Sequence, residues 1–236
     1  MTRVTYHNQL ALLLLWFVAG CSWGFQESNG DIPEMHQNLS RTVDIQTGVI
    51  QGNLEQATAA ADWILSRQDQ ISFPSGGREY QDALLDHASI IASATDLGAA
   101  AVQTGRLAAA CGSCHQATGG GPRFMVGTES PTGESQESQM IRHLWAADRM
   151  WEGLVGPSEE AWLAGANAFS ESQPSLASEL RASGIMESAE GLLREVNLLA
   201  KEALTASGQD ERADIYGRLL TTCNRCHGSS GFDVLK

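Results

Sequence analysis

Apolar residues recur every three or four positions along most of this chain, which is the spacing that places them on one face of an α-helix. Leu39, Val43 and Ile50 are an example, and Ala57, Ala60 and Ile64 follow the same rule. Proline and glycine interrupt the pattern at 74–77, 156–157 and 173–174. No segment shows the strict alternation of a strand. The pattern predicts an all-α protein with helices over about 33–51, 53–64, 79–94, 96–115, 138–155, 158–171, 178–206 and 208–228.

Composition and charge exclude some function classes. Of the 236 residues, 42% are hydrophobic and 18% are charged, which is typical of a folded protein. The 28 acidic against 15 basic residues give a formal charge of −13. Nucleic acids and anionic lipid surfaces bind basic proteins, so neither is expected as the main partner. The negative charge is compatible with a redox partner protein that docks through a basic patch, although an acidic composition can also serve solubility alone.

The N-terminus is typical of a secretory signal. Leu10–Val18 is an apolar run of nine residues, which is too short to span a bilayer. It is followed by Val18-Ala19-Gly20-Cys21, which resembles the lipobox of bacterial lipoproteins. That resemblance implies a signal peptide over 1–20, a lipid on Cys21, and a protein held at the periplasmic side of a membrane only by this anchor. Ser22 in place of aspartate favours the outer membrane. The alternative is conventional cleavage that leaves Cys21 as a free thiol.

The other four cysteines form two Cys-x-x-Cys-His motifs, which are Cys111-Gly112-Ser113-Cys114-His115 and Cys223-Asn224-Arg225-Cys226-His227. This is the attachment pattern of c-type haem, in which two thiols on one helical turn bind the porphyrin vinyl groups and the adjacent imidazole ligates the iron. A zinc site, a redox dithiol and structural disulfides are the alternatives. None of the three needs a histidine after each pair. The sequence therefore predicts two covalently bound haem c groups.

The motifs divide the chain into two similar halves. A Gly/Pro/Ser-rich linker over 121–137 separates a first domain, 27–120, from a second, 138–236, and each is expected to mature alone. Two alignments of the halves remain open. One pairs Gly52 with Gly156 and therefore His36 with Met140. The other is shifted by one residue and pairs Gly48 with Gly153 and Met35 with Met140.

A haem motif on the last of four helices resembles the class II cytochromes c, the cytochrome c-prime family. In cytochromes of class I the motif lies near the N-terminus of the domain, whereas only nine residues follow His227. The resemblance implies two tandem four-helix bundles with His115 and His227 as proximal iron ligands. Members of the family dimerise through their first two helices, a contact that the two halves of this chain can make internally.

In the same family the sixth iron position is faced by a residue of the first helix, which is apolar in some members and methionine or histidine in others. The heptad phase of Val43 and Ile50 selects His36 in the first half, and Met140 has the corresponding phase in the second. Met35 and His143 are the alternatives one residue or one turn away. His87 is expected at the bundle surface or beside the propionates, and Trp145 and Trp151 in the core.

These features predict a dihaem electron-transfer protein that is not an enzyme. Binding of nitric oxide or carbon monoxide at an open haem, as in cytochromes c-prime, is the alternative function. A dihaem peroxidase is disfavoured because those enzymes resemble class I domains. Neither a catalytic dyad nor a nucleotide-binding loop is recognisable in the sequence.

Overall fold

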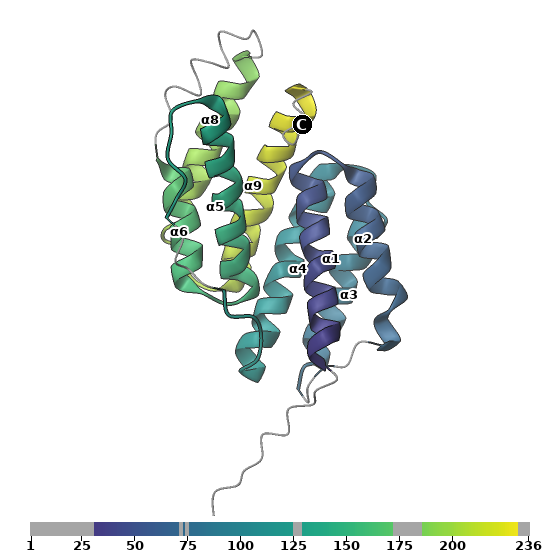
Figure 1. Cartoon of the computed structure of the whole chain (residues 1–236). Coiled ribbons are helices and arrows are strands. Elements are labelled where there is room, and N and C mark those ends of the chain that lie inside the picture. Colours follow the sequence, from purple (N-terminus) through teal and green to yellow (C-terminus); the bar gives the residue numbers. More distant parts are fainter. Residues whose placement is uncertain (1–30, 71–72, 74–75, 125–128, 172–185, 231–236) are drawn as a thin grey trace, which may run out of the picture.

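A computed structural model describes residues 31–70, 73, 76–124, 129–171 and 186–230. The predicted signal peptide 1–20 and Cys21 lie outside these residues, as do the first residues of the predicted domain that starts at 27. The described part is helical and contains no strand, which confirms the all-α prediction. Its helices are α1 (Asp31–Ile50), α2 (Leu54–Ser66), α3 (Arg78–Ala92), α4 (Leu97–Thr118), α5 (Gln136–Val155), α6 (Glu159–Ser170), α8 (Met186–Ala203) and α9 (Gln209–Ser230), with a 3-10 turn η1 (Gln68–Gln70) after α2 (Figure 1).

Helix starts are fixed by polar caps close to the predicted positions. The side chain of Asn53 accepts a hydrogen bond from the Gln56 N–H at the start of α2. Asp96 and Ser158 cap α4 and α6 in the same way. Such caps satisfy backbone N–H groups that have no partner inside the helix. The predicted helix boundaries are confirmed within a few residues. The exception is the expected 178–206 helix, whose first residues fall outside the described part of the chain.

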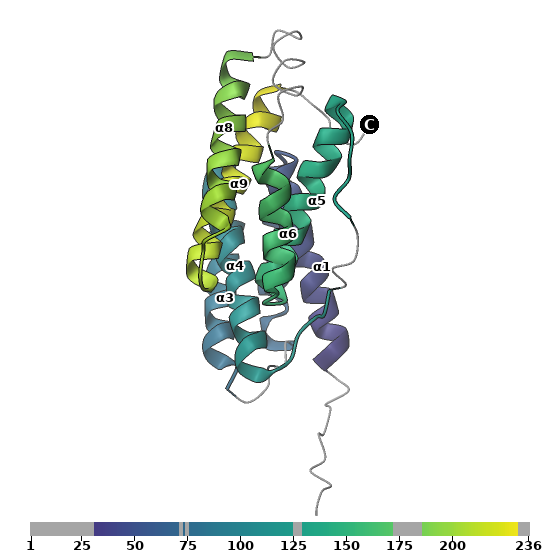
Figure 2. The same cartoon turned by 90° about the vertical axis from the view of Figure 1, so that its left-hand side faces the viewer.

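The helices form two sets that follow each other in the chain. In the first set, α1 packs on α2, α2 on α3 and α3 on α4; in the second, α5 packs on α6, α6 on α8 and α8 on α9 (Figures 1 and 2). The most extensive contact of any helix pair joins α4 to α9, the last helices of the two sets. The two sets therefore meet mainly through their last helices and not through their first two.

Glycine is the reason why α4 and α9 pack so closely. A Cβ on Gly105 would overlap the Ala213 carbonyl oxygen, and one on Gly217 would lie 2.9 Å from the Val102 Cα. Gly98 lies near Thr221, so the two helices run antiparallel. Ala101 is part of the same contact, since a Cβ on Gly217 would lie 3.3 Å from its carbonyl oxygen.

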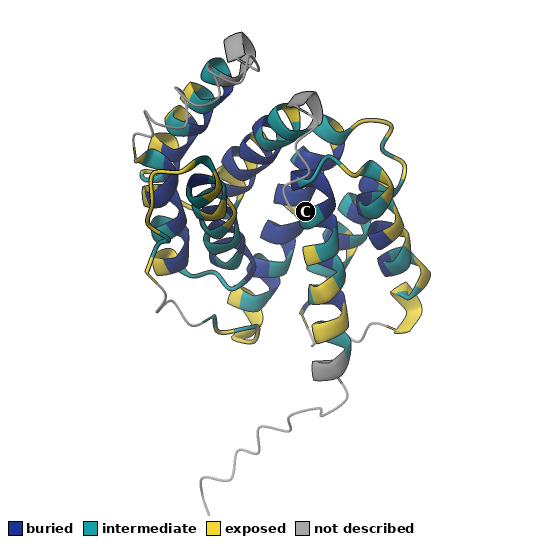
Figure 3. Cartoon of the chain, turned by 45° about the horizontal axis from the view of Figure 1, so that its top comes forward, coloured by how far each residue is buried: buried dark blue, intermediate teal, exposed yellow. Residues whose placement is uncertain are grey.

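One hydrophobic core runs through both helix sets. Its buried members include Ile45 and Leu107 from the first set and Leu154, Leu199 and Leu219 from the second. Figure 3 shows buried positions on the inner sides of both sets and where the sets meet. The predicted boundaries at 27–120 and 138–236 separate the two sets in sequence, but the core does not stop between them.

The structure decides between the two alignments of the halves. A Cβ on Gly48 would lie 2.9 Å from the Ala57 nitrogen, and one on Gly153 would lie 2.6 Å from the Trp162 nitrogen. Both contacts occur where the first helix of a set turns into the second. The alignment that pairs Gly48 with Gly153 is therefore correct, and it pairs Met35, not His36, with Met140.

Candidate functional site

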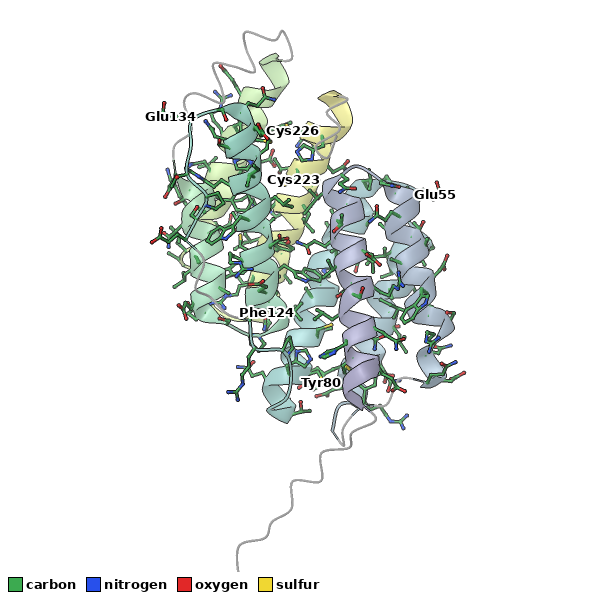
Figure 4. The ribbon with its side chains drawn as sticks, in the orientation of Figure 1. Glu55, Tyr80, Phe124, Glu134, Cys223 and Cys226 are labelled. Carbon is green, nitrogen blue, oxygen red and sulfur yellow. The ribbon has the colours of Figure 1, made fainter. Side chains whose placement is uncertain are left out.

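The two Cys-x-x-Cys-His motifs lie on corresponding helices at opposite ends of the molecule. Cys111, Cys114 and His115 are in the last turns of α4, and Cys223, Cys226 and His227 are in the last turns of α9. Because α4 and α9 run antiparallel, the first motif is at the lower end of Figure 1 and the second at the upper end, where Figure 4 labels Cys223 and Cys226. The structure therefore provides two separate sites.

This placement argues against the alternatives to haem attachment. The cysteine pairs are too far apart to ligate one zinc ion together, and the described residues contain no group of three or more His, Cys, Asp or Glu arranged to hold a metal ion. All four described cysteines are free thiols and form no disulfide. A thioredoxin-like dithiol requires a sheet, and no strand occurs in the part of the chain that the structure describes.

Burial keeps the motif thiols protonated. It raises the pKa of Cys111 to about 12, and the neighbouring thiol of Cys114 adds to the effect. Burial together with Cys226 raises the pKa of Cys223 to about 12 as well. Catalytic cysteines instead have a lowered pKa, because the thiolate is the reactive form. These thiols are not suited to catalysis by a free thiolate.

Each motif histidine is oriented by a backbone carbonyl. The Nδ1 of His115 lies 2.7 Å from the Val155 oxygen, and the Nδ1 of His227 lies 2.7 Å from the Ile50 oxygen. A carbonyl only accepts hydrogen bonds, so Nδ1 carries the proton in both rings and the lone pair of the neutral ring is on Nε2. A histidine that ligates a metal through Nε2 has this tautomer, and its Nδ1–H commonly donates a hydrogen bond to a backbone carbonyl.

The glycine run after α4 folds back over the first motif, which the sequence did not reveal. Gly119 ends the helix with a φ of 71°, and Gly121 has a φ of 103°. A Cβ on Gly121 would overlap the His115 ring, so no other residue fits there without moving the imidazole. Phe124 then packs beside Gly156 at the end of α5. The start of the segment predicted as a linker is therefore part of the first site (Figure 4).

The distal candidates of the first half lie on α1. The buried stripe of that helix includes Thr42, Ile45 and Val49, and the half-buried Met35 is in phase with it. His36 is exposed, and Val43, which defined its expected phase, is 39% exposed. The phase assigned to His36 is therefore not that of the buried face. The pattern was misread because Val43 is an apolar residue on the outer side of the helix.

In the second half the expected phase agrees with the structure. Ala147 and Leu154 are buried on α5, and the half-buried Met140 continues their heptad. His143 is half-buried one turn further on, and its ring contacts Phe169 of α6 at 5.3 Å between centroids. These placements make Met35 and Met140 the matched pair of the two halves.

The other residues singled out from the sequence, one histidine and two tryptophans, contact side chains or the core of the helix sets. The Nδ1 of His87 on α3 lies 2.9 Å from the Gln103 side-chain oxygen on α4. Trp151 is buried in the core, as expected. Trp145 is only partly buried, and the guanidinium of Arg149 lies 5.8 Å from its ring centroid.

A buried polar network joins the two sets between the sites. Gln46 on α1 donates to the Tyr216 hydroxyl on α9 at 2.9 Å and to the Asp148 carboxylate on α5 at 3.3 Å. The Tyr216 hydroxyl in turn donates to the Ala147 carbonyl at 3.1 Å. Burial raises the pKa of Asp148 above its ordinary value, and the Gln46 hydrogen bond and Arg149 only partly oppose this effect.

This raised pKa predicts a pH-dependent stability. Between the unfolded and the folded pKa of Asp148 the native state binds more protons than the unfolded state, so the free energy of unfolding falls as the pH rises. Asp148→Asn keeps the acceptor for Gln46 and removes the charge. We expect it to stabilise the protein at about pH 7 and to have the least effect at about pH 3, where the wild-type carboxyl is protonated in both states. Urea unfolding at both pH values measures this, and an equal effect at both would contradict the prediction.

No protein-family model, curated protein sequence or solved structure matches this chain. None of the described helices has the length and apolarity needed to cross a membrane.

The residues of both motifs fit a covalently attached haem. Each motif provides two free thiols one helical turn apart and an imidazole whose Nδ1 is already hydrogen-bonded. Two thiols and an imidazole are the groups that hold a c-type haem, and the carbonyl that orients the imidazole is already in place.

Proposed function

We propose that the chain is a periplasmic dihaem c-type cytochrome that transfers single electrons between redox partners and is not an enzyme. It is built from two cytochrome c-prime-like units, with thioether bonds at Cys111, Cys114, Cys223 and Cys226. The observation that carries the proposal is that both motif histidines hold Nδ1 on a helix-end carbonyl at the same distance of 2.7 Å. Because the histidine of each motif is oriented by the same kind of backbone carbonyl, the two motifs are interpreted as two sites of the same kind.

The chain's own residues set the environment of each site. When bound, the haem iron supplies the reversible one-electron change. His115 and His227 would ligate it through Nε2, with ring orientation fixed by the Val155 and Ile50 carbonyls. The acidic surface, with its formal charge of −13, would attract a partner through a basic patch.

Maturation of the full precursor in a host that attaches c-type haem tests the proposal. The purified protein should carry two haem groups that remain bound after denaturation, and a redox titration should show two one-electron steps. Cys111→Ser with Cys114→Ser should leave one haem, and so should Cys223→Ser with Cys226→Ser. A protein without covalent haem would overturn the proposal. A spectral shift of the reduced protein with carbon monoxide would instead support gas binding at an open iron.

The lipid anchor is proposed from Cys21 alone and has its own test. Cys21→Ser should release a folded protein with both haems from the membrane fraction, because no described helix can serve as a membrane span. The wild-type protein should stay in the pellet after a salt wash. If the variant also stays there, the lipobox interpretation is wrong.

Side-chain truncation identifies the distal ligands. We expect Met35→Ala and Met140→Ala each to lower the potential of one haem or make it high-spin, because a thioether ligand favours ferrous iron. His36→Ala is the matched control, since His36 neighbours Met35 but is exposed. Redox titration with absorption spectroscopy measures all three. A change caused by His36→Ala and not by Met35→Ala would restore the original assignment of His36.

A further inference from the structure

The hydrogen bonds of the two motif histidines cross from one helix set to the other. His227 belongs to α9 of the second set, and its acceptor, Ile50, ends α1 of the first set. His115 belongs to α4 of the first set, and its acceptor, Val155, ends α5 of the second set. Both acceptor residues are nearly buried, with exposed fractions of 8% and 2%. The exchange is reciprocal, since each set gives one carbonyl and receives one.

The two carbonyls are the ones that their own helices leave without a partner. At the end of α1, the Thr47, Gly48 and Val49 oxygens accept from the following backbone N–H groups. The next oxygen, that of Ile50, accepts from His227. A helix end leaves its last carbonyls without an intrahelical donor, and it is also the negative end of the helix dipole. The histidine therefore satisfies a group that needs a donor.

At the end of α5 the last carbonyl groups are also bonded to donors from outside the helix. The Glu152 and Gly153 oxygens accept from backbone N–H groups that follow the helix. The Leu154 oxygen accepts from the Gln209 side chain at 3.1 Å, and the Val155 oxygen accepts from His115. Gln209, at the start of α9, thus helps to hold the helix end that positions His115.

We propose that each helix set positions the iron-ligating histidine of the other set, so that the end of α1 tunes the second haem and the end of α5 tunes the first. This inference rests on the proposed function. A carbonyl that accepts from Nδ1 fixes the plane and tautomer of the ring and makes Nε2 a stronger donor to a metal. Weakening that bond shifts the potential of the haem on the opposite set to more positive values.

Two glycines of the first set provide the test and its control. Gly52 follows the end of α1 with a φ of 77°, and Gly76 lies between α2 and α3 with a φ of 89° and open space where a Cβ would go. Gly52→Ala strains the turn that carries the Ile50 carbonyl, whereas Gly76→Ala introduces a similar backbone strain at the opposite end of the first set, away from the second motif. Both variants are made in the full-length haem-loaded protein.

Gly52→Ala is expected to raise the potential of the second haem, while the potential of the first haem is unchanged. Gly76→Ala is expected to leave the potential of the second haem unchanged. Each haem is assigned with the variants that lack one cysteine pair, and helix content confirms folding. An effect of Gly52→Ala on the first haem only, or on neither, would overturn the inference. A protein without covalent haem would overturn the proposed function instead.

Gln209→Ala tests the opposite crossing and does not depend on a glycine. It leaves the Leu154 oxygen without its side-chain donor, so the end of α5 loosens beside the Val155 carbonyl. The first haem should shift to a more positive potential although Gln209 lies in the second set, and the second haem should be unchanged. If the second haem shifts and the first does not, the crossed arrangement is wrong.

Discussion

Replacing Gly112 with asparagine is expected to destabilise the protein by about 3 kcal/mol and to disturb the first haem motif, whereas Asn224→Gly costs at most about 1 kcal/mol. The two residues occupy the same place in their motifs, directly after the first cysteine. Each substitution installs the residue that the other motif already has. A general requirement of haem attachment would make the two changes similar.

The difference comes from the neighbours of the two motifs. Gly112 is buried against the end of α5, where a Cβ would overlap the Leu154 carbonyl oxygen and would lie 2.6 Å from the Gln209 side-chain nitrogen. A backbone atom cannot move aside cheaply, so α5 has to shift, and the Val155 carbonyl next to Leu154 moves away from His115. Asn224 is only half-buried, so its removal mainly costs helix propensity.

Urea unfolding of the haem-loaded variants measures the difference, and covalent haem content measures the damage to each motif. Gly191→Ala is the second control, because this residue lies inside α8 with nothing within 4 Å of where its Cβ would be. It should be neutral or stabilise by about 0.5 kcal/mol. Equal stabilities of Gly112→Asn and Asn224→Gly would show that the close packing of α5 on the first motif is absent.

The helices and the motifs could be predicted from the sequence because both depend on local patterns. Asn53 and Asp96 are local signals for helix starts, and the two Cys-x-x-Cys-His motifs are recognised by spacing alone. The contact between α4 and α9 could not be predicted, since Gly105 and Gly217 look like weak points of a helix until the partner is known. The backbone acceptors of His115 and His227 left no signal, because any residue has a carbonyl.

The phase of α1 shows why one helix face was misread. Leu39, Val43 and Ile50 suggested an apolar stripe, but the buried face also contains polar residues, namely Asn38, Thr42 and Gln46. Gln46 is buried because its partners, Asp148 and Tyr216, come from the other set. A hydrophobic pattern cannot reveal a polar residue whose partners lie 102 and 170 positions further along the chain.

Neither half alone is expected to give a folded, haem-loaded monomer. Each half was expected to mature independently because it has four helices and its own motif. A chain of residues 27–120 would expose the face of α4 that packs on α9 and would leave Gln46, which is 2% exposed in the whole protein, without its partners. It would also lose the Val155 carbonyl that holds His115.

The halves are therefore expected to fold together even when the chain is cut. Residues 27–128 and 129–236, exported as two chains in the same cell, should associate through α4 and α9 and retain both haems, because the contacts between the sets are still available and Gly121 stays joined to the first motif. Gly105→Leu in the first fragment is the control, since its side chain would collide with the Ala213 carbonyl and block association. Size-exclusion chromatography and covalent haem content distinguish the outcomes. A single fragment that is monomeric, cooperatively folded and loaded with haem would contradict this prediction. It would show that each set folds without the other, so that α4 and α9 pack together as the surfaces of two independent domains.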